Sequence, residues 1–257
     1  MTTQNRSISA ERLEILRWTA SLGAITAEAL AVRQAVPVVS ARGRLSAQCR
    51  RGLLARSRPL SERPALFTLT AAGARAAGLP GLASCRVRPS NASHLIACAL
   101  AAASLQRCYP DQRVLGEREL RHSERACGHP LASARLVGRY AGCTGLHRPD
   151  LVLAPVAEEL ALPVAVEVEL SVKAPRRLSE ICRAWARCPQ VEGVLYLVSE
   201  QVQPAVRRAV AAARAGERIA VVRLDALENR LTRSLASFTG EITSEGEQPC
   251  LTRTSIA

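Results

Sequence analysis

The chain has 257 residues, which is long enough to enclose a large hydrophobic core or two domains. Its 35 Lys and Arg residues against 22 Asp and Glu residues give a formal net charge of +13 at pH 7, which indicates a polyanionic partner such as nucleic acid. No apolar run reaches the length of a membrane span, no secretory signal core is present, and the nine cysteines form no CxxC pair. We therefore expect a cytoplasmic protein with reduced thiols and no membrane partner.

The positive charge is concentrated in the first part of the chain. Residues 1–85 carry a net charge of +8, residues 86–148 carry +6, and residues 149–257 carry −1. This distribution predicts a DNA-binding element at the N-terminus and a separate candidate site in the C-terminal half.

Three short helices are predicted near the N-terminus, over residues 9–22, 26–33 and 40–54. The first ends at Gly23, and the third is rich in arginine, which favours a helix-turn-helix. Two strand-like segments, 53–58 and 67–70, flank a turn with proline and arginine, as in the wing of a winged helix. The stretch GLLARSRPLSERPALFTLTAAGARAAG resembles winged-helix regulators strongly.

In that interpretation two elements contact double-stranded DNA. The third helix would face the major groove, and the wing would reach phosphates or the minor groove. The predicted DNA-binding residues are Arg42, Arg44, Gln48 and Arg51 on the helix and Arg56, Arg58 and Arg63 on the wing. The alternative is a winged helix that contacts proteins, with arginines that only solvate its surface.

We divide the chain into a winged helix-turn-helix domain at 1–80, a linker at 81–92, an α/β domain at 93–238 and a mobile tail at 239–257. An Ala-rich helix is predicted over 93–107, with His94 near its start as either a ligand or a cap-region residue. A strand is predicted over 113–121, with Glu117 and Glu119 on one face, followed by a long connection.

The stretch at 148–177 carries the densest chemistry. Apolar runs at 151–155 and 162–170 predict strands, and along the second the polar residues Glu167, Glu169, Ser171 and Lys173 occupy alternate positions on one face. Charges on a buried strand must be paired or bound to a metal. If Asp150 lies on the neighbouring strand, its carboxylate joins Glu167 and Glu169 in a pocket for Mg²⁺ or Mn²⁺.

Lys173 is the only lysine in a chain that otherwise uses arginine, which favours a specific role for its compact ammonium group. The alternative is a solvated strand face on which Glu169 and Lys173 form a surface ion pair.

These residues resemble the PD-(D/E)xK nuclease superfamily, because Pro149 and Asp150 match its first two letters. In one register Glu167 is the acid and Glu169 stands where lysine is usual. In the other, Glu169 is the acid, Ser171 fills the lysine position and the lysine function moves to Lys173. Both registers remain open. The resemblance implies Asp150, Glu167, Glu169 and Lys173 as catalytic residues, the three carboxylates among them as metal ligands.

A helix at 176–187, a strand at 193–199, a helix at 202–215 and a strand at 218–224 complete the prediction. The fold expected is α/β, with the winged helix-turn-helix domain before a restriction-endonuclease-like αβββαβ core. The acid that many superfamily members carry on the first core helix is missing. LTAAG, GERELR, RPDLVL and EVELSVKAPRRL resemble the replication-relaxation proteins of bacterial mobile elements, which implies a role in plasmid replication, relaxation or transfer.

Two further sets of residues have alternative interpretations. Arg176, Arg177 and Arg183 would hold DNA next to the site; in the alternative, Arg183 and Arg187 would pair with Glu180 and its neighbours on the helix surface. A C-x-H and C-x₃-H pattern, formed by Cys127, His129, Cys143 and His147, is a candidate zinc staple with an unfamiliar spacing.

The sequence thus predicts a DNA-binding protein of a mobile element or plasmid with a Mg²⁺-dependent endonuclease site. The main alternative is a non-enzymatic accessory factor or transcriptional regulator with a degenerate nuclease-like domain, and a third is a regulator that senses a small molecule. A homodimer is expected if the DNA target is palindromic, and replication or transfer proteins of the element are expected partners.

Overall fold

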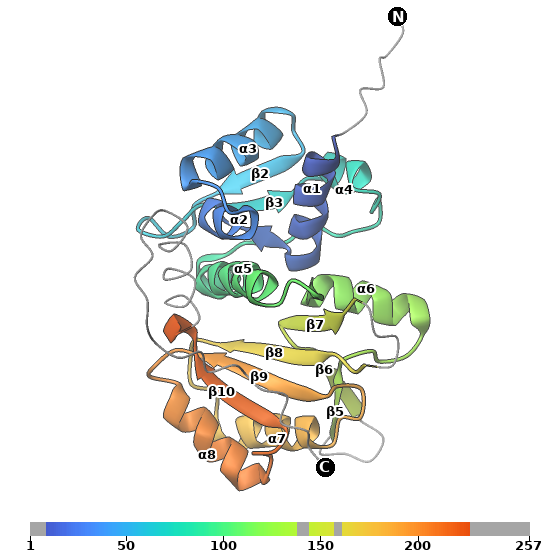
Figure 1. Cartoon of the computed structure of the whole chain (residues 1–257), viewed down its shortest axis with the longest axis vertical. Helices are drawn as coiled ribbons and strands as arrows, with labels where there is room; N and C mark the ends of the chain where they lie inside the picture. The colour runs from blue at the N-terminus through green and yellow to red at the C-terminus, as the bar shows by residue number, and fades with distance from the viewer. Residues whose placement is uncertain (1–8, 138–143, 157–160, 227–257) are drawn as a thin grey trace, which may run out of the picture.

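The structure is a computed structural model that describes residues 9–137, 144–156 and 161–226 (Figure 1). The predicted tail at 239–257 and Cys143 lie outside the described residues. An N-terminal helical region with a small antiparallel sheet precedes a five-stranded mixed sheet, which confirms the α/β class. Within the described ranges, no helix combines the length and the apolarity needed to cross a membrane.

The N-terminal region begins with the three predicted helices. The first ends at Gly23, whose φ of 89° is a conformation that glycine adopts readily. The second is capped by Thr26, whose hydroxyl oxygen accepts a hydrogen bond from the Ala29 backbone N–H at 3.0 Å. The third begins directly after Pro37, two residues before its predicted start. Their bounds are α1 (Ala10–Leu22), α2 (Ala27–Gln34) and α3 (Val38–Arg50).

A small antiparallel sheet follows these helices. Strands β2 (Leu54–Ser57) and β3 (Leu66–Leu69) form the predicted hairpin, and the helix α4 (Ala71–Ala76) comes directly after it. The short strand β1 (Ala24–Ile25), which was not predicted, pairs with β3 on its other side and gives the sheet order β1-β3-β2.

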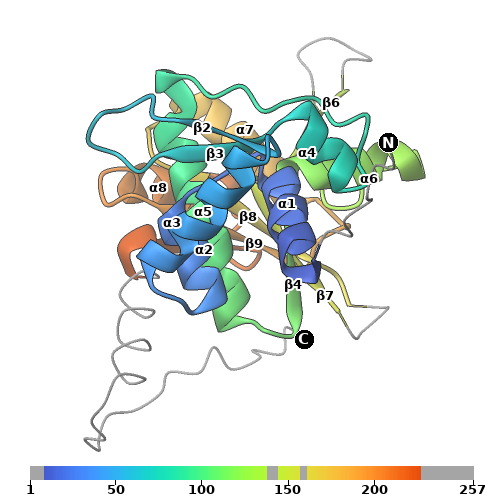
Figure 2. The same cartoon turned by 90° about the horizontal axis from the view of Figure 1, so that it is seen from above.

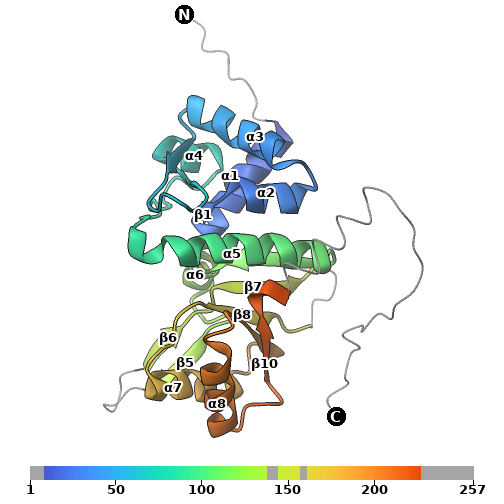
Figure 3. The ribbon, with the colours of Figure 1, turned by 90° about the vertical axis from the view of Figure 1, so that its left-hand side faces the viewer.

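Helix α5 (Pro89–Cys108) lies between the N-terminal region and the large sheet (Figures 1 and 3). Its many buried alanines allow close approach on more than one side, and one hydrophobic cluster extends from α1 and α2 across α5 to the sheet. The predicted linker at 81–92 is therefore too long by four residues, because the helix already begins at Pro89.

The large sheet has the order β10-β9-β8-β7-β4. Strands β4, β7 and β8 are antiparallel neighbours, whereas β8, β9 and β10 run parallel, as expected where helices connect them. Helices α7 and α8 cover the face opposite α5 (Figure 1), and Figure 2 shows the N-terminal helices stacked over the sheet. The bounds are β4 (Gln112–Gly116), β7 (Leu151–Pro155), β8 (Val164–Glu169), α7 (Pro175–Ala186), β9 (Gly193–Val198), α8 (Gln203–Ala213) and β10 (Ile219–Arg223).

The predicted strand over 113–121 is wrong in its second half. The chain leaves the sheet at Gly116 and continues as helix α6 (Glu117–Cys127). A side chain at Gly116 would place its Cβ 2.3 Å from the carbonyl oxygen of Ser21, so only glycine permits the contact with α1.

The connection after α6 also contains structure that was not predicted. Strands β5 (Ala134–Val137) and β6 (Thr144–His147) pair antiparallel. Strand β6 ends at His147, three residues before Asp150, so this hairpin leads directly into β7.

Candidate functional site

Asp150, just before β7, stands next to Glu167 of β8 in the sheet, but the two carboxylates have partners on opposite faces: Asp150 contacts His94 of α5, and Glu167 contacts Trp185 of α7. Leu151 pairs with Val166, so the same antiparallel register places Asp150 opposite Glu167. The carboxylate of Asp150 also replaces a backbone partner, because its Oδ2 accepts a hydrogen bond from the Val168 N–H at 2.8 Å. The expectation that Asp150 lies next to the glutamate strand is therefore confirmed.

Both glutamates of β8 are buried, at 3% exposure for Glu167 and 5% for Glu169. A buried carboxylate without partners is strongly unfavourable, so each one must be matched by donors or cations. Strand β8 ends at Glu169, and Ser171 and Lys173 lie beyond it in the loop before α7. The predicted alternation therefore holds for the two glutamates but does not continue as a strand to Lys173.

Glu167 is held by two aromatic donors. Its Oε1 lies 2.7 Å from Nε2 of His147 and accepts a hydrogen bond from the Trp185 indole at 3.0 Å. The two rings meet edge to face, with centroids 5.7 Å apart. Burial raises the pKa of Glu167, although the hydrogen bond with His147 opposes this shift.

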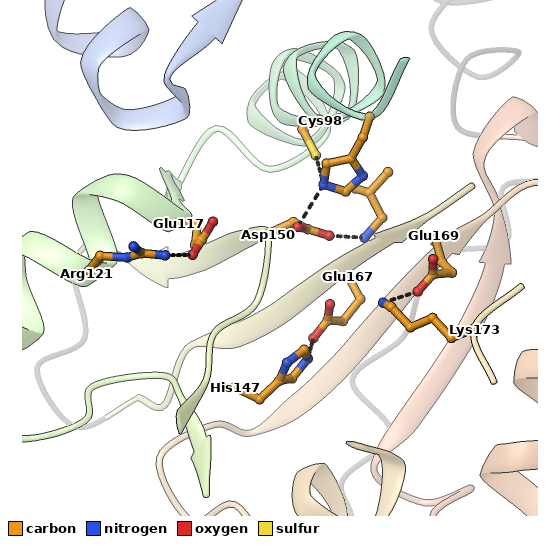
Figure 4. Close-up of polar contacts among 10 residues, drawn as sticks. Cys98, Glu117, Arg121, His147, Asp150, Glu167, Glu169 and Lys173 are labelled. Atoms are coloured by element: carbon orange, nitrogen blue, oxygen red, sulfur yellow. Dashed lines mark hydrogen bonds and ion pairs between the residues drawn. The ribbon is translucent and has the colours of Figure 1, made fainter. Parts of the chain in front are cut away.

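Glu169 pairs with Lys173 four residues later (Figure 4). Burial lowers the pKa of Lys173, but the hydrogen bond with Glu169 and the neighbouring carboxylates outweigh it, so the net shift is upward. The only lysine of the chain is thus an ammonium group at the edge of the carboxylate cluster.

Asp150 has its own partners on α5. Its Oδ1 lies 3.0 Å from Nε2 of His94, and the same nitrogen lies 3.4 Å from Sγ of Cys98. The hydrogen bond with Asp150 raises the pKa of His94, whereas burial lowers it by less. Figure 4 shows Cys98 projecting from α5 toward Asp150. Of the two interpretations of His94, the structure favours a side chain directed at the site.

A metal at the predicted carboxylates would find the chemistry it prefers, since carboxylate oxygens are the usual ligands of Mg²⁺ and Mn²⁺. Among the described residues, however, the group whose ligand atoms all lie within 4.8 Å of one another is His94, Cys98 and Asp150. Glu167 and Glu169 are not part of that group.

Glu117 lies beside the site although its strand assignment was wrong. Its backbone N–H donates to the Asp150 carbonyl at 3.0 Å, which places the start of α6 beside the start of β7. Its side chain pairs with Arg121 (Figure 4), and Glu119 pairs with Arg113. Neither glutamate is on the strand face where it was predicted.

The arginines predicted to bind DNA differ in their exposure and in the side chains that already pair with them. Arg42 is exposed on α3 but lies 3.7 Å from Glu28, and Arg51 is exposed at the end of the helix. Arg44 is held by Glu11 at 2.7 Å and by Gln34 at 2.7 Å. The wing residues Arg56, Arg58 and Arg63 are all exposed.

Gln48 cannot contact a groove in this structure. It is buried at 3% exposure because it lies on the face of α3 that packs inward. Its place on the outer face is taken by Arg50, which is exposed together with Val39, Arg42 and Gly43. The helical spacing of these residues could have identified that face from the sequence.

Two of the arginines after the site form ion pairs on the surface of α7. Arg176 and Arg177 both pair with Glu180, at 3.3 Å and 3.8 Å, on the exposed side of α7. The described members of the predicted zinc set have different surroundings. His147 contacts Glu167, whereas Cys127 and His129 are exposed. The fourth member, Cys143, lies outside the described residues.

A cavity of about 630 Å³ lies away from these carboxylates, between α1 and the β4–α6 segment. Its charged residues are only partly paired. Arg33 pairs with Glu14 at 2.9 Å and stacks on Trp18, and Arg113 pairs with Glu119. Among the described residues, Arg33 Nη1 and Arg118 Nε are buried without a hydrogen-bond partner. The convergence of acids, imidazoles and an ammonium group at β7 and β8 is the stronger indication of chemistry.

No known protein family, curated protein or solved structure matches the chain. The support for a functional site is therefore the arrangement of this chain's own side chains around Asp150 and Glu167. Cys98 and Trp185 belong to the site but were not predicted, and His147 was predicted only as a zinc ligand, because each reaches the cluster from a different element. The one available signal was that His147 stands three residues before Asp150 in the sequence.

Proposed function

We propose that this chain is a DNA-binding protein with a metal-dependent endonuclease site of the PD-(D/E)xK type. The observation that carries the proposal is Asp150 opposite the buried Glu167 on paired strands, with Glu169 and the only lysine of the chain beside them. A structural core would avoid three carboxylates at one strand junction, because their burial is unfavourable.

The arrangement of the large sheet supports the same proposal. Leaving out α6 and the β5–β6 hairpin, the chain follows the order α5, β4, β7, β8, α7, β9, which is the αβββαβ order of the nuclease superfamily. Asp150 precedes β7, and Glu167 lies on the adjacent strand β8, as that resemblance implies. Because the strand register places Asp150 opposite Glu167, we favour the arrangement in which Glu167 is the acidic residue of the motif and Glu169 stands at the lysine position.

DNA would be held by the N-terminal region, which we propose is a winged helix-turn-helix domain. The outer face of α3 presents Arg42 and Arg50, and Val39 is 75% exposed near its start, where it offers an apolar contact to a thymine methyl group. The exposed arginines of the β2–β3 turn would contact phosphates. An origin in a mobile element or plasmid rests on the sequence resemblance alone.

Asp150, Glu167 and Glu169 would hold Mg²⁺ or Mn²⁺, which lowers the pKa of bound water and polarises a phosphoryl oxygen. Lys173 remains an ammonium group because its pKa is raised, so its role is to neutralise charge on the phosphate rather than to accept a proton. His147 and Trp185 would keep the Glu167 carboxylate oriented.

The test is cleavage of supercoiled plasmid and linear duplex in Mg²⁺, in Mn²⁺ and in EDTA. Metal-dependent nicking that is lost in Asp150→Asn and in Glu167→Gln would support the endonuclease. Arg125→Ala is the matched control, because Arg125 is exposed on α6 away from these carboxylates.

One observation favours a second candidate function. Each carboxylate already has a basic partner, namely His94, His147 or Lys173, and such closed pairs suit a domain that has lost its metal. DNA binding without cleavage in any metal would support an accessory factor of replication or transfer.

A further inference from the structure

His94, Cys98 and Asp150 place a nitrogen, a sulfur and an oxygen donor around one point between α5 and the sheet. His94 and Cys98 are four residues apart on α5, so they lie on the same face of the helix. Asp150 reaches them from the position just before β7. The three ligand atoms lie within 4.8 Å of one another.

We propose that these three side chains bind Zn²⁺. Thiolate and imidazole are ligands that Zn²⁺ prefers and that Mg²⁺ does not, so this donor set selects a transition metal. The inference deepens the proposed function, because Asp150 would belong both to this site and to the nuclease site, but it is tested by metal binding rather than by cleavage.

Two of the three donor separations agree with a tetrahedral ion. Zn–N and Zn–S bonds of about 2.0 and 2.3 Å at tetrahedral angles place the nitrogen and sulfur about 3.5 Å apart, and the nitrogen and a carboxylate oxygen about 3.3 Å apart. The corresponding distances here are 3.4 Å from His94 Nε2 to Cys98 Sγ and 3.0 Å to Asp150 Oδ1.

Hydrogen bonding alone satisfies this cluster poorly. Nε2 of His94 faces both the carboxylate and the thiol, yet an imidazole nitrogen carries either a proton or a lone pair. If it donates to Asp150, the thiol proton of Cys98 cannot be accepted by the same nitrogen. A cation instead uses the lone pair of Nε2, the thiolate and the carboxylate together.

Two further features fit a site that an ion can enter. Cys98 is 8% exposed, whereas the side chains of His94 and Asp150 are 41% and 22% exposed, so the cluster is open on the His94 side. The second oxygen of Asp150 is fixed by the Val168 N–H, which orients the ligand as outer partners do in metal sites. Three protein ligands leave a fourth position for water.

The experiment is titration of the metal-free full chain with Co²⁺, which reports thiolate coordination directly. We expect a thiolate-to-cobalt charge-transfer band and tetrahedral ligand-field bands, both removed by one equivalent of Zn²⁺. Cys98→Ser should abolish the charge-transfer band, and His94→Gln should weaken binding by at least about tenfold, since even loss of an outer partner costs about that much. Cys49→Ser, on α3, is the matched control and should leave the spectrum unchanged.

X-ray absorption of Zn²⁺-loaded wild type gives the same information without a variant, and one sulfur ligand with nitrogen and oxygen is expected. A shell without sulfur, or a charge-transfer band that persists in folded Cys98→Ser, would overturn the inference. Mg²⁺-dependent cleavage without any cobalt band would overturn the zinc site and leave the nuclease proposal standing. A protein that never cleaves DNA, but shows a cobalt band that Glu167→Gln leaves intact, would overturn the nuclease proposal and leave the zinc site standing.

Discussion

The carboxylate of Asp150 completes the pairing of two strands. Strand β7 begins only at Leu151, yet Oδ2 of Asp150 accepts a hydrogen bond from the Val168 N–H of β8 at 2.8 Å. The Asp150 side chain thus binds the backbone of β8 at Val168, between Glu167 and Glu169. The other oxygen of Asp150 faces His94 on α5. One residue therefore connects β7, β8 and α5 at the candidate site.

Replacing Asp150 should lower stability in proportion to the hydrogen bonds removed. In Asp150→Ala the Val168 N–H loses its acceptor, which costs about 1–3 kcal/mol when the group is buried. Asp150→Asn retains an acceptor oxygen and should lose less. Urea unfolding of the metal-free proteins measures both, and equal stability of wild type and Asp150→Ala would contradict the structural role.

Arg148 should be important for folding rather than for DNA contact. It donates at 2.8 Å to Glu124, which is only 5% exposed and also accepts from the Leu131 N–H. Removing one partner of a buried ion pair costs about 3–5 kcal/mol, so Arg148→Ala should be strongly destabilised. Arg125→Ala, on the exposed side of the same helix as Glu124, should change the free energy of unfolding by less than about 0.5 kcal/mol.

The outer face of α3 should determine the salt dependence of DNA binding. Arg42→Ala and Arg50→Ala should each reduce the slope of log K against log salt by about 1, as expected for the loss of one phosphate contact. Gln48→Ala should leave the slope unchanged, because Gln48 is buried. Fluorescence anisotropy across a salt series measures these slopes. A loss of slope in Gln48→Ala, with none in the two arginine variants, would place the DNA on another surface.

The thiol of Cys182 should make stability fall in alkaline solution. Burial raises its pKa from 9.0 to about 11. Between these values the unfolded chain loses the proton that the folded chain retains, so folding becomes less favourable as the pH rises, by up to about 1.4 kcal/mol per pH unit. The stability of wild type relative to Cys182→Ala should therefore decline from pH 9.0 to about 11. A constant difference across that range would contradict the shift.

Much of the sheet could be predicted because its strands are short runs of Val and Leu with clear ends. The strands over 151–155 and 193–198 were placed to within a residue. The strand over 113–121 was extended too far because Glu117 and Glu119, two residues apart, were placed on one face of a strand. The helix that begins there depends on a bond between the Glu117 N–H and the Asp150 carbonyl, and the local pattern contains no sign of it.

The candidate site, too, could be predicted only in part from the sequence. Asp150, Glu167, Glu169 and Lys173 lie within one short stretch, so a period of two was enough to group them. Their partners come from elsewhere: Cys98 from α5 and Trp185 from α7. No spacing in the sequence connects those residues, because only the packing of helices on both faces of the sheet brings them together.

The most direct test of the nuclease proposal is single-turnover cleavage of duplex DNA by wild type, Asp150→Asn and Glu167→Gln, with DNA binding measured on the same samples. All three should bind DNA alike, because the proposed contacts lie on α3 and the β2–β3 wing. Only wild type should cleave, and only with Mg²⁺ or Mn²⁺ present. Cleavage that persists in both folded variants, or that continues in EDTA, would contradict a site built on Asp150 and Glu167.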